Sequence, residues 1–390
     1  MDISEKTSVK SEHEAEKLAR IAFHSIKGVG SGRLRQIIAY FGSALNAWYA
    51  SESEFKKWGT ESWAHSVMSE RSRIDPHQMA RSLAQKEVKT VIPEEEHYPA
   101  LLRELADAPP LLYYKGNIEA GEEGVALVGS RKATPYGKAA AEFLGKELVR
   151  QGLVVVSGLA RGIDTAAHKG ALSGQGKTWA ILGSGLDYLY PPENKKIAEQ
   201  IILQGAIISE FAPGVPPEPQ FFPMRNRIIS GVARGVVVVE AAARSGALIT
   251  VDFALEQGRE VFAVPGPIFS GQSKGCHQLI RQGAKLVEGV EDILSEFIIE
   301  SRDCNYVNEI NFASDKNPDK IKDDICKEKS LAPEQQEILA FLSDLPLHID
   351  QIALQSTLTA SQVALVLLEL QLNGKIEQLP GQRYVLARKC

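Results

Sequence analysis

The chain contains 390 residues, 44% of them hydrophobic and 24% charged, which is ordinary for a globular protein and long enough for two or three folding units. A net charge of -5 argues against a protein that is basic over its whole surface, although positive charge can still gather locally. The four cysteines show no C-x-x-C spacing, so they indicate neither a zinc site nor a disulfide framework and favour a cytoplasmic protein.

The start of the chain contains no targeting signal that we can identify. Its first seventeen residues are polar and charged, and no apolar run in the sequence approaches the ~20 residues that a membrane helix needs. We therefore expect no signal peptide and no membrane partner.

Residues 1–90 predict a small helical domain. An apolar face that begins at Ala15 continues past a glycine turn at residues 27–32 into Leu34 and Ile37, which resembles a helix-hairpin-helix. The glycines would let backbone N–H groups approach a phosphate, as suits weak, sequence-blind contact with DNA. A plain helical domain with a glycine turn is at least as good an interpretation, because such turns are common between helices.

Residues 91–300 predict an α/β domain with an extended Rossmann-like, doubly wound parallel sheet. Prolines bar a regular helix at residues 98–114, which we interpret as the approach to the sheet. Beyond them short apolar runs alternate with helical stretches, and runs such as 236–239 are continuous, as a parallel sheet covered on both faces requires. The predicted strands are 125–128, 153–156, 178–182, 206–209, 236–239, 260–263 and 284–287.

The first of these strands leads into a loop that favours an anion. Residues 125–137 predict strand, tight loop and helix, and the first N–H groups of such a helix face negative charge. A dinucleotide fold would need a second glycine where this chain has Arg131, and an acid where it has Ser157 and Gly158. Arg131 instead offers a planar fork of donors to a phosphodiester, unless it is a plain solvated loop residue.

Four further segments rich in glycine or serine should reach the same edge of the sheet, because they follow predicted strands. They are residues 157–164, 183–187, 222–231 and 245–250. Residues 125–235 hold 13 Lys and Arg against 8 Asp and Glu, a local charge of +5. Such a surface suits a string of phosphates better than one mononucleotide. The cations expected at this edge are Arg131, Lys132, Arg161, Arg225 and Arg227.

The end of the chain predicts a linker and a winged helix. Residues 301–330 are polar and acidic, as a linker should be, and residues 331–390 predict three helices followed by a hairpin. The third helix would enter a DNA groove in a typical winged helix, yet it contains no Lys or Arg between Thr359 and Asn373. Contact with a protein or a regulatory role is therefore favoured over DNA readout.

Three motifs occur together and in order: FPMRNRIISG at 222–231, SGALIT at 245–250 and VFAVPG at 261–266. Because of these motifs the sequence resembles the DNA-processing protein A family, also called DprA or Smf. The resemblance extends from the N-terminal hairpin domain to the C-terminal winged helix. The resemblance implies a protein that binds incoming single-stranded DNA and loads the RecA recombinase onto it during natural transformation. It also implies a homodimer, no cofactor and no catalytic reaction.

The resemblance also implies which residues bind nucleic acid. One of Phe221 and Phe222 would stack on a base, since ring stacking tolerates any sequence, or both are core aromatics. The other expected contacts are Gly129, Ser130, Arg131 and Lys132 in the first loop, Ser157, Gly158 and Arg161 in the second, and Arg225, Asn226 and Arg227 in the third motif.

The last strand and the helix before it resemble the family's dimer edge, where two copies pair across a two-fold axis. The residues that we expect there are His277, Leu279, Ile280 and Leu286. No second metal ligand stands at a suitable spacing from His277, which favours an interface or core histidine.

Two other functions are open at this point. Asp164, His168, Asp187 and Glu240 could together supply the acid and base of an enzyme that cleaves the glycosidic bond of a nucleotide, as in a nucleotide phosphoribohydrolase. Alternatively, a winged-helix transcription regulator would use the α/β domain to sense a ligand and the end of the chain to bind DNA. The uncharged third helix weakens this second alternative.

Overall fold

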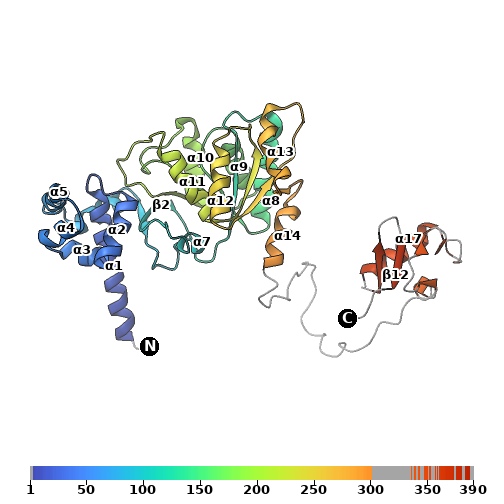
Figure 1. The fold of residues 1–390 in the computed structure, drawn as a ribbon, viewed down its shortest axis with the longest axis horizontal. Helices are drawn as coiled ribbons and strands as arrows, with labels where there is room; N and C mark the ends of the chain where they lie inside the picture. The colour runs from blue at the N-terminus through green and yellow to red at the C-terminus, as the bar shows by residue number, and fades with distance from the viewer. Residues whose placement is uncertain are drawn as a thin grey trace. The chain divides into compact units, whose positions relative to one another are not determined.

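The computed structural model describes residues 3–300 and, beyond them, separate stretches between 335 and 386 (Figure 1). The chain divides into two compact units, Met1–Val307 and Asn308–Cys390. The predicted linker at 301–330 lies outside the described residues. Among the described residues no helix is both long and apolar enough to span a membrane.

The N-terminal region is helical, as the apolar spacing predicts. Its core surrounds Phe23 and Phe55, whose rings contact Trp48 and Trp63 at 5.1 and 5.9 Å between centroids. Helix starts are set locally, since the side chains of Ser43 and Asp75 accept from the first free N–H groups of their helices. The helices are α1 (Ile3–Ser25), α2 (Ser31–Phe41), α3 (Ala44–Tyr49), α4 (Glu52–Trp58), α5 (Glu61–Arg71) and α6 (Pro76–Gln85).

The sheet of the first unit has nine strands in the order β1-β2-β6-β5-β4-β3-β7-β8-β9. The seven strands from β3 onward are parallel, and each overlaps one of the seven predicted strands, although β9 is shorter than predicted. Two antiparallel strands at one edge were missed, because β2 begins two residues after a pair of prolines and β1 is very short. The strands are β1 (Lys89–Val91), β2 (Leu112–Gly116), β3 (Gly124–Gly129), β4 (Val154–Ser157), β5 (Thr178–Leu182), β6 (Ala206–Ser209), β7 (Ala233–Glu240), β8 (Glu260–Ala263) and β9 (Lys285–Leu286).

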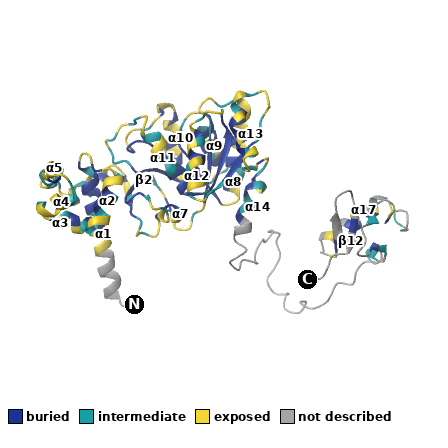
Figure 2. Cartoon of the chain, in the orientation of Figure 1, coloured by how far each residue is buried: buried dark blue, intermediate teal, exposed yellow. Residues whose placement is uncertain are grey.

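Helices cover both faces of this sheet, which explains the continuous apolar strands (dark blue in Figure 2). Val125 and Leu127 pack on the side of α8 and α9, whereas Ala126 and Val128 pack on the side of α11 and α12. The helices are α7 (Ala100–Arg103), α8 (Pro135–Arg150), α9 (Ile163–Ser173), α10 (Lys195–Gln204), α11 (Phe221–Gly231), α12 (Ala247–Glu256), α13 (Lys274–Arg281) and α14 (Val290–Glu300), with 3-10 turns η1 (Pro192–Asn194) and η2 (Gly271–Ser273).

The strand order reverses between β3 and β7, which are neighbours in the centre of the sheet. From β3 the chain proceeds through β4 and β5 to β6 on one side, and from β7 it proceeds through β8 to β9 on the other. The loops after β3 and β7 therefore diverge, which opens a crevice at their carboxyl ends. Ligands of open α/β sheets bind in such a crevice.

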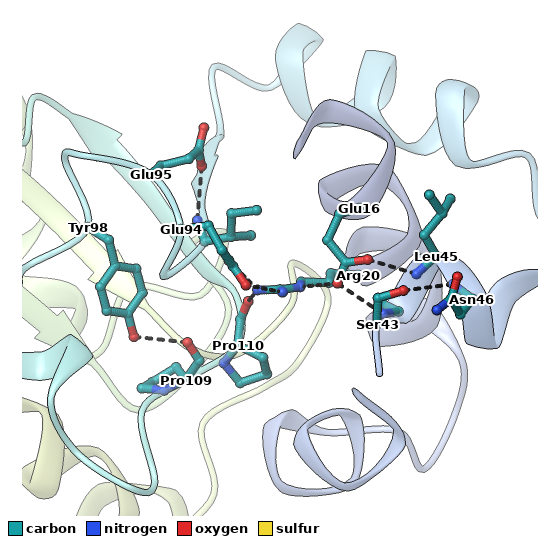
Figure 3. A network of polar contacts seen from close by, with 12 residues as sticks. Glu16, Arg20, Ser43, Leu45, Asn46, Glu94, Glu95, Tyr98, Pro109 and Pro110 are labelled. Atoms are coloured by element: carbon teal, nitrogen blue, oxygen red, sulfur yellow. Dashed lines mark hydrogen bonds and ion pairs between the residues drawn. The ribbon is translucent and has the colours of Figure 1, made fainter. Parts of the chain in front are cut away.

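A buried arginine joins the N-terminal helices to the sheet (Figure 3). The Arg20 guanidinium of α1 donates to Glu16 at 2.8 Å, to Glu94 at 2.9 Å and to the carbonyl of Pro110 at 2.9 Å. Glu16 in turn accepts from the backbone N–H groups of Ala44 and Leu45 at the start of α3. Three segments far apart in the sequence are thus held by one cation, whose side chain is only 4% exposed.

The described part of the second unit contains one long helix and a small antiparallel sheet, consistent with the expected winged helix. Its core includes Ile352, Val363 and Leu367. The helix is α17 (Ala360–Leu372), and the strands β10 (Leu347–His348), β11 (Ile376–Leu379) and β12 (Arg383–Leu386) pair in the order β10-β12-β11. The first two predicted helices of this unit fall largely outside the described residues.

Candidate functional site

A cavity of about 610 Å³ lies at the crevice between β3 and β7. Three segments form most of its wall: the loop after β3, the first half of α11 and the loop between β7 and α12. The residues that line it and carry the argument below are Gly129, Ser130, Arg131, Lys132, Asp164, Phe222, Arg225, Asn226, Arg244, Thr250 and Gln272.

A buried glutamate shapes the loop after β3. Glu240, which is 3% exposed, accepts from the N–H and the hydroxyl of Thr134 at 2.8 and 2.7 Å, and its carbonyl accepts from the N–H of Ser130 at 2.7 Å. The Thr134 hydroxyl also caps α8 by accepting from Gly137 at 3.1 Å. A Cβ on Gly137 would come within 2.6 Å of the Glu240 carboxylate, so this helix start requires glycine. The loop is therefore held in place from inside, while the side chains of Arg131 and Lys132 are exposed.

Three cations surround the mouth of the cavity. Arg131, Lys132 and Arg244 are exposed, and within the described part of the chain none of these side chains has a hydrogen-bond or ion-pair partner. Sequence reasoning missed Arg244, although it follows β7 much as Arg131 follows β3. Its place became recognisable from the strand order, because β3 and β7 are the neighbouring strands between which that order reverses.

Of the two consecutive phenylalanines, Phe222 lines the cavity and Phe221 does not. The Phe222 ring is half-buried, with Tyr190 at 5.8 Å and the Arg131 guanidinium over its face at 5.4 Å. Phe221 packs instead against Phe211, at 4.5 Å between centroids, on the other side of α11. Consecutive residues of a helix point about 100° apart, which separates the two rings.

Arg225 forms the floor of the cavity rather than its rim. It is 3% exposed and donates to the carbonyl of Gly158 at 2.8 Å and to that of Ile181. Burial lowers the pKa of Arg225 to about 10, so the side chain stays positive at neutral pH. Gly158 must lack a side chain, because a Cβ there would lie 2.6 Å from the guanidinium.

Asp164 lies beside this guanidinium and holds the loop after β4. Its carboxylate accepts from the N–H groups of Gly158 and Ala160 at 3.1 and 3.3 Å. Burial raises the pKa of Asp164, while the charge of Arg225 and the two N–H groups oppose that rise. The acid therefore positions backbone next to the cavity.

The structure does not bring every predicted contact to this cavity. Ser157 is fully buried and donates to the carbonyl of Leu127 at 2.6 Å, and Arg161 pairs with Glu193 in a separate depression. Arg227 pairs with Glu210 and Asp107 on the side of α11 that faces away. For these residues and Phe221, contact with nucleic acid stays a prediction that the cavity does not support.

The acids and base of the enzyme alternative do not converge. Of the four, Asp164 alone lines the cavity. His168 is buried beside Thr178 at 2.7 Å, and burial lowers its pKa to about 3. Asp187 accepts from the N–H of Gly214 at 2.9 Å, and Glu240 is occupied by the first loop. The described residues contain no group of three or more His, Cys, Asp or Glu side chains that could hold a metal.

Two more polar residues at the cavity escaped the sequence reasoning. The amide oxygen of Gln272 is buried without a hydrogen-bond partner, and Thr250 of α12 is buried beside it in the lining. Gln272 belongs to none of the predicted segments, and Thr250 is the last residue of the predicted segment 245–250 but was not singled out within it. The hydroxyl of Ser245, just before α12, accepts from the N–H of Ala247 at 3.3 Å.

The residues expected at a dimer edge differ in their exposure. Leu279 is 8% exposed and packs into the core of its own chain, and His277 lies 2.9 Å from the carbonyl of Gly266. Ile280 is half-buried, and Leu286 on the edge strand β9 is 41% exposed. Ile280 and Leu286 are thus the better placed of the four for contact with a second chain.

Known proteins match this sequence over most of its length. The family described as DNA recombination-mediator protein A matches residues 89–298, and the DprA winged helix domain matches residues 327–382. Protein Smf of Synechocystis is 34% identical over 93% of this chain and 97% of its own length. DNA processing protein DprA of Streptococcus pneumoniae is 51% identical over 51% of this chain and 71% of its own.

The fold has a solved counterpart. The X-ray structure of DNA processing protein A from Streptococcus pneumoniae superposes with a TM-score of 0.63 at 37% identity. The superposition covers 72% of this chain and 97% of that one.

We predict that the two arginines of the site contribute very differently to stability. Arg225→Ala leaves two carbonyl groups unpaired and Asp164 buried without its cation, so it should lower the free energy of unfolding by on the order of 3 kcal/mol. Arg131→Ala removes an exposed side chain and should change the free energy of unfolding by less than about 0.5 kcal/mol. Urea unfolding followed by circular dichroism measures both, and equal losses would contradict the distinction between floor and rim.

Proposed function

The chain belongs to the DNA recombination-mediator protein A family, and from that premise we propose that it binds single-stranded DNA at the cavity between β3 and β7. We propose further that it acts as a homodimer and loads a RecA recombinase onto the bound strand, with natural transformation as the setting.

The observation that carries the proposal is the set of three exposed cations around the cavity that have no hydrogen-bond or ion-pair partner among the described residues. Arg131, Lys132 and Arg244 extend from two loops on opposite sides of the crevice, so they can contact successive phosphates of a chain that crosses it. The acids of this region are turned inward, since Glu240 and Asp164 hold backbone N–H groups. Phosphate contacts of this kind give affinity without sequence preference.

The Phe222 ring favours a single strand over a duplex. It is half-buried at the cavity wall, and a base can stack on it only when that base is not already stacked and paired in a helix. The cavity of about 610 Å³ supplies room for such a base. Asn226 and Gln272 in the lining offer polar atoms to base edges.

A recombinase is supported as the partner by the family description alone, which names a mediator of recombination. A mediator must hold DNA and release it to another protein. Loops that bind by charge and stacking, without enclosing the strand, suit such a transfer, because the affinity per nucleotide is modest.

Binding tests separate phosphate contacts from base contacts. Arg131→Ala and Arg244→Ala should each weaken binding of an oligonucleotide by on the order of 1–3 kcal/mol and reduce the dependence on salt. Phe222→Ala should weaken binding by a similar amount with little change in the salt dependence. Fluorescence anisotropy at several salt concentrations measures these effects.

The matched control is Arg150→Ala, at the far end of α8 and about 20 Å from the cavity by helix length. It should bind like the unchanged protein. If Arg131→Ala and Arg150→Ala bind equally well, the cavity is not the DNA site.

Loading can be measured apart from binding. On single-stranded DNA covered by a single-strand binding protein, the full chain should shorten the delay before RecA filaments form, and Arg131→Ala should lose that effect with its DNA affinity. A chain that binds the strand yet leaves the delay unchanged would overturn the proposed loading and leave the proposed DNA binding standing.

Assembly has a separate test. Leu286→Glu and Ile280→Glu each place two charges across a two-fold axis without partners, so either change should convert a dimer to monomers. Leu203→Glu is the control, because Leu203 on α10 is 84% exposed. Size-exclusion chromatography with light scattering gives the mass, and an unchanged dimer in both edge variants would place the interface elsewhere.

A further inference from the structure

A second cavity, of about 780 Å³, lies on the other side of α11. The glycine turn between α1 and α2 forms one wall, and the loop after β6 with the outer side of α11 forms the other. Both walls belong to the first compact unit, which the Arg20 contacts hold together. The residues used below are Lys27, Gly30, Gly32, Arg35, Lys86, Glu210 and Phe221.

The glycine turn presents the start of a helix to this cavity. Gly30 is the N-cap of α2, and no side chain caps the helix there. The first N–H groups of a helix have no partner within the helix, and together with its dipole they favour an anion. A Cβ on Gly30 or on Gly32 would meet no atom within 4 Å, and both residues line the cavity, so there is open space beside the helix start.

Cations surround that space. Lys27, in the turn after α1, and Lys86, the C-cap of α6, are exposed at its mouth, and within the described residues neither side chain has an ion-pair partner. Deeper in the cavity one guanidinium nitrogen of Arg35 is buried without a hydrogen-bond partner. The combination of helix start and cations from three elements is suited to a phosphate.

A buried acid in the same cavity has one oxygen that lacks a hydrogen-bond donor. Glu210 is 2% exposed, and one of its oxygens pairs with Arg227 while the other has no hydrogen-bond partner. An unpaired buried oxygen is costly, and a sugar hydroxyl or a base amino group would satisfy it. A nucleotide carries both a phosphate and such a donor.

The two cavities are linked by α11. Phe221 lines the second and Phe222 the first, so a strand that passes over the start of this helix leaves one cavity and enters the other. We propose that the second cavity binds a further nucleotide of the DNA strand, with its phosphate at the start of α2 and a hydrogen-bond donor on Glu210. This inference rests on the proposed function and extends the length of strand that one chain holds.

Gly30→Asp tests the proposal, because its effects on folding and on binding have opposite signs. Gly30 has extended backbone angles, φ -86° and ψ 179°, which suit an aspartate N-cap, so the variant should melt at an equal or higher temperature. The carboxylate would occupy the phosphate position and should weaken binding of a strand of about sixteen nucleotides roughly tenfold. A strand of about four nucleotides, which fills the first cavity alone, should bind unchanged.

Gly30→Ser is the matched control, since serine caps the helix without a charge and should leave both affinities within about twofold. Lys86→Glu repeats the test from the opposite wall and should weaken binding of the long strand alone. Equal affinity of the Asp and Ser variants for the long strand would overturn the proposal. If Arg131→Ala still weakens both strands in that case, the proposed function survives.

A free nucleotide carries the same phosphate and donor groups, so it is the alternative occupant of the second cavity. Deoxyadenosine monophosphate should not raise the melting temperature of the protein when the cavity serves a strand. The contrary result has two parts: the mononucleotide raises the melting temperature of Gly30→Ser but not of Gly30→Asp, and the long strand binds both variants equally. In that case the occupant is a free nucleotide and the strand proposal is overturned.

Discussion

The buried guanidinium of Arg225 is the contact on which the arrangement of the site depends. It ties α11 to the carbonyl of Gly158 beyond β4 and to that of Ile181 within β5, so the helix is fixed in rotation against the carboxyl ends of two strands. With the rotation fixed, Phe222 and Asn226 face one cavity while Phe221 and Arg227 face the other. A guanidinium suits this task because it offers several donors in one plane and stays charged when buried.

The positive charge of the crevice depends on the burial of the acids near it. Glu240, Asp164 and Glu210 are all nearly buried, and each is engaged by backbone N–H groups or by an arginine. Their negative charge is therefore compensated inside the protein, whereas Arg131, Lys132 and Arg244 are exposed and form no hydrogen bond or ion pair with the described residues. A chain with a net charge of -5 can in this way present a positive crevice.

The sequence predicts the central sheet well, because continuous apolar strands between helical stretches leave few alternatives. It also places Arg131 correctly after β3, since a strand, a loop and a helix follow each other within thirteen residues. The sequence did not predict the different roles of Arg225 and Arg227. Residues 221–231 form a helix rather than an open loop, so two arginines that are neighbours in a motif point to different sides, one inward and one toward Glu210. Arg244 and Gln272 became recognisable only once the neighbouring strands were known.

The position of Arg131 over the face of Phe222 has a consequence for selectivity. A base that stacks on this face must first displace the guanidinium, and an exposed cation–π contact is worth about 0.5–1 kcal/mol. That cost is the same for all four bases, because it comes from the loss of the contact between the guanidinium and the ring. In the proposed DNA complex the guanidinium would therefore leave the ring most readily when a phosphate attracts its charge. Phosphate contact and base stacking would then be coupled, which would favour a polymer over an isolated base.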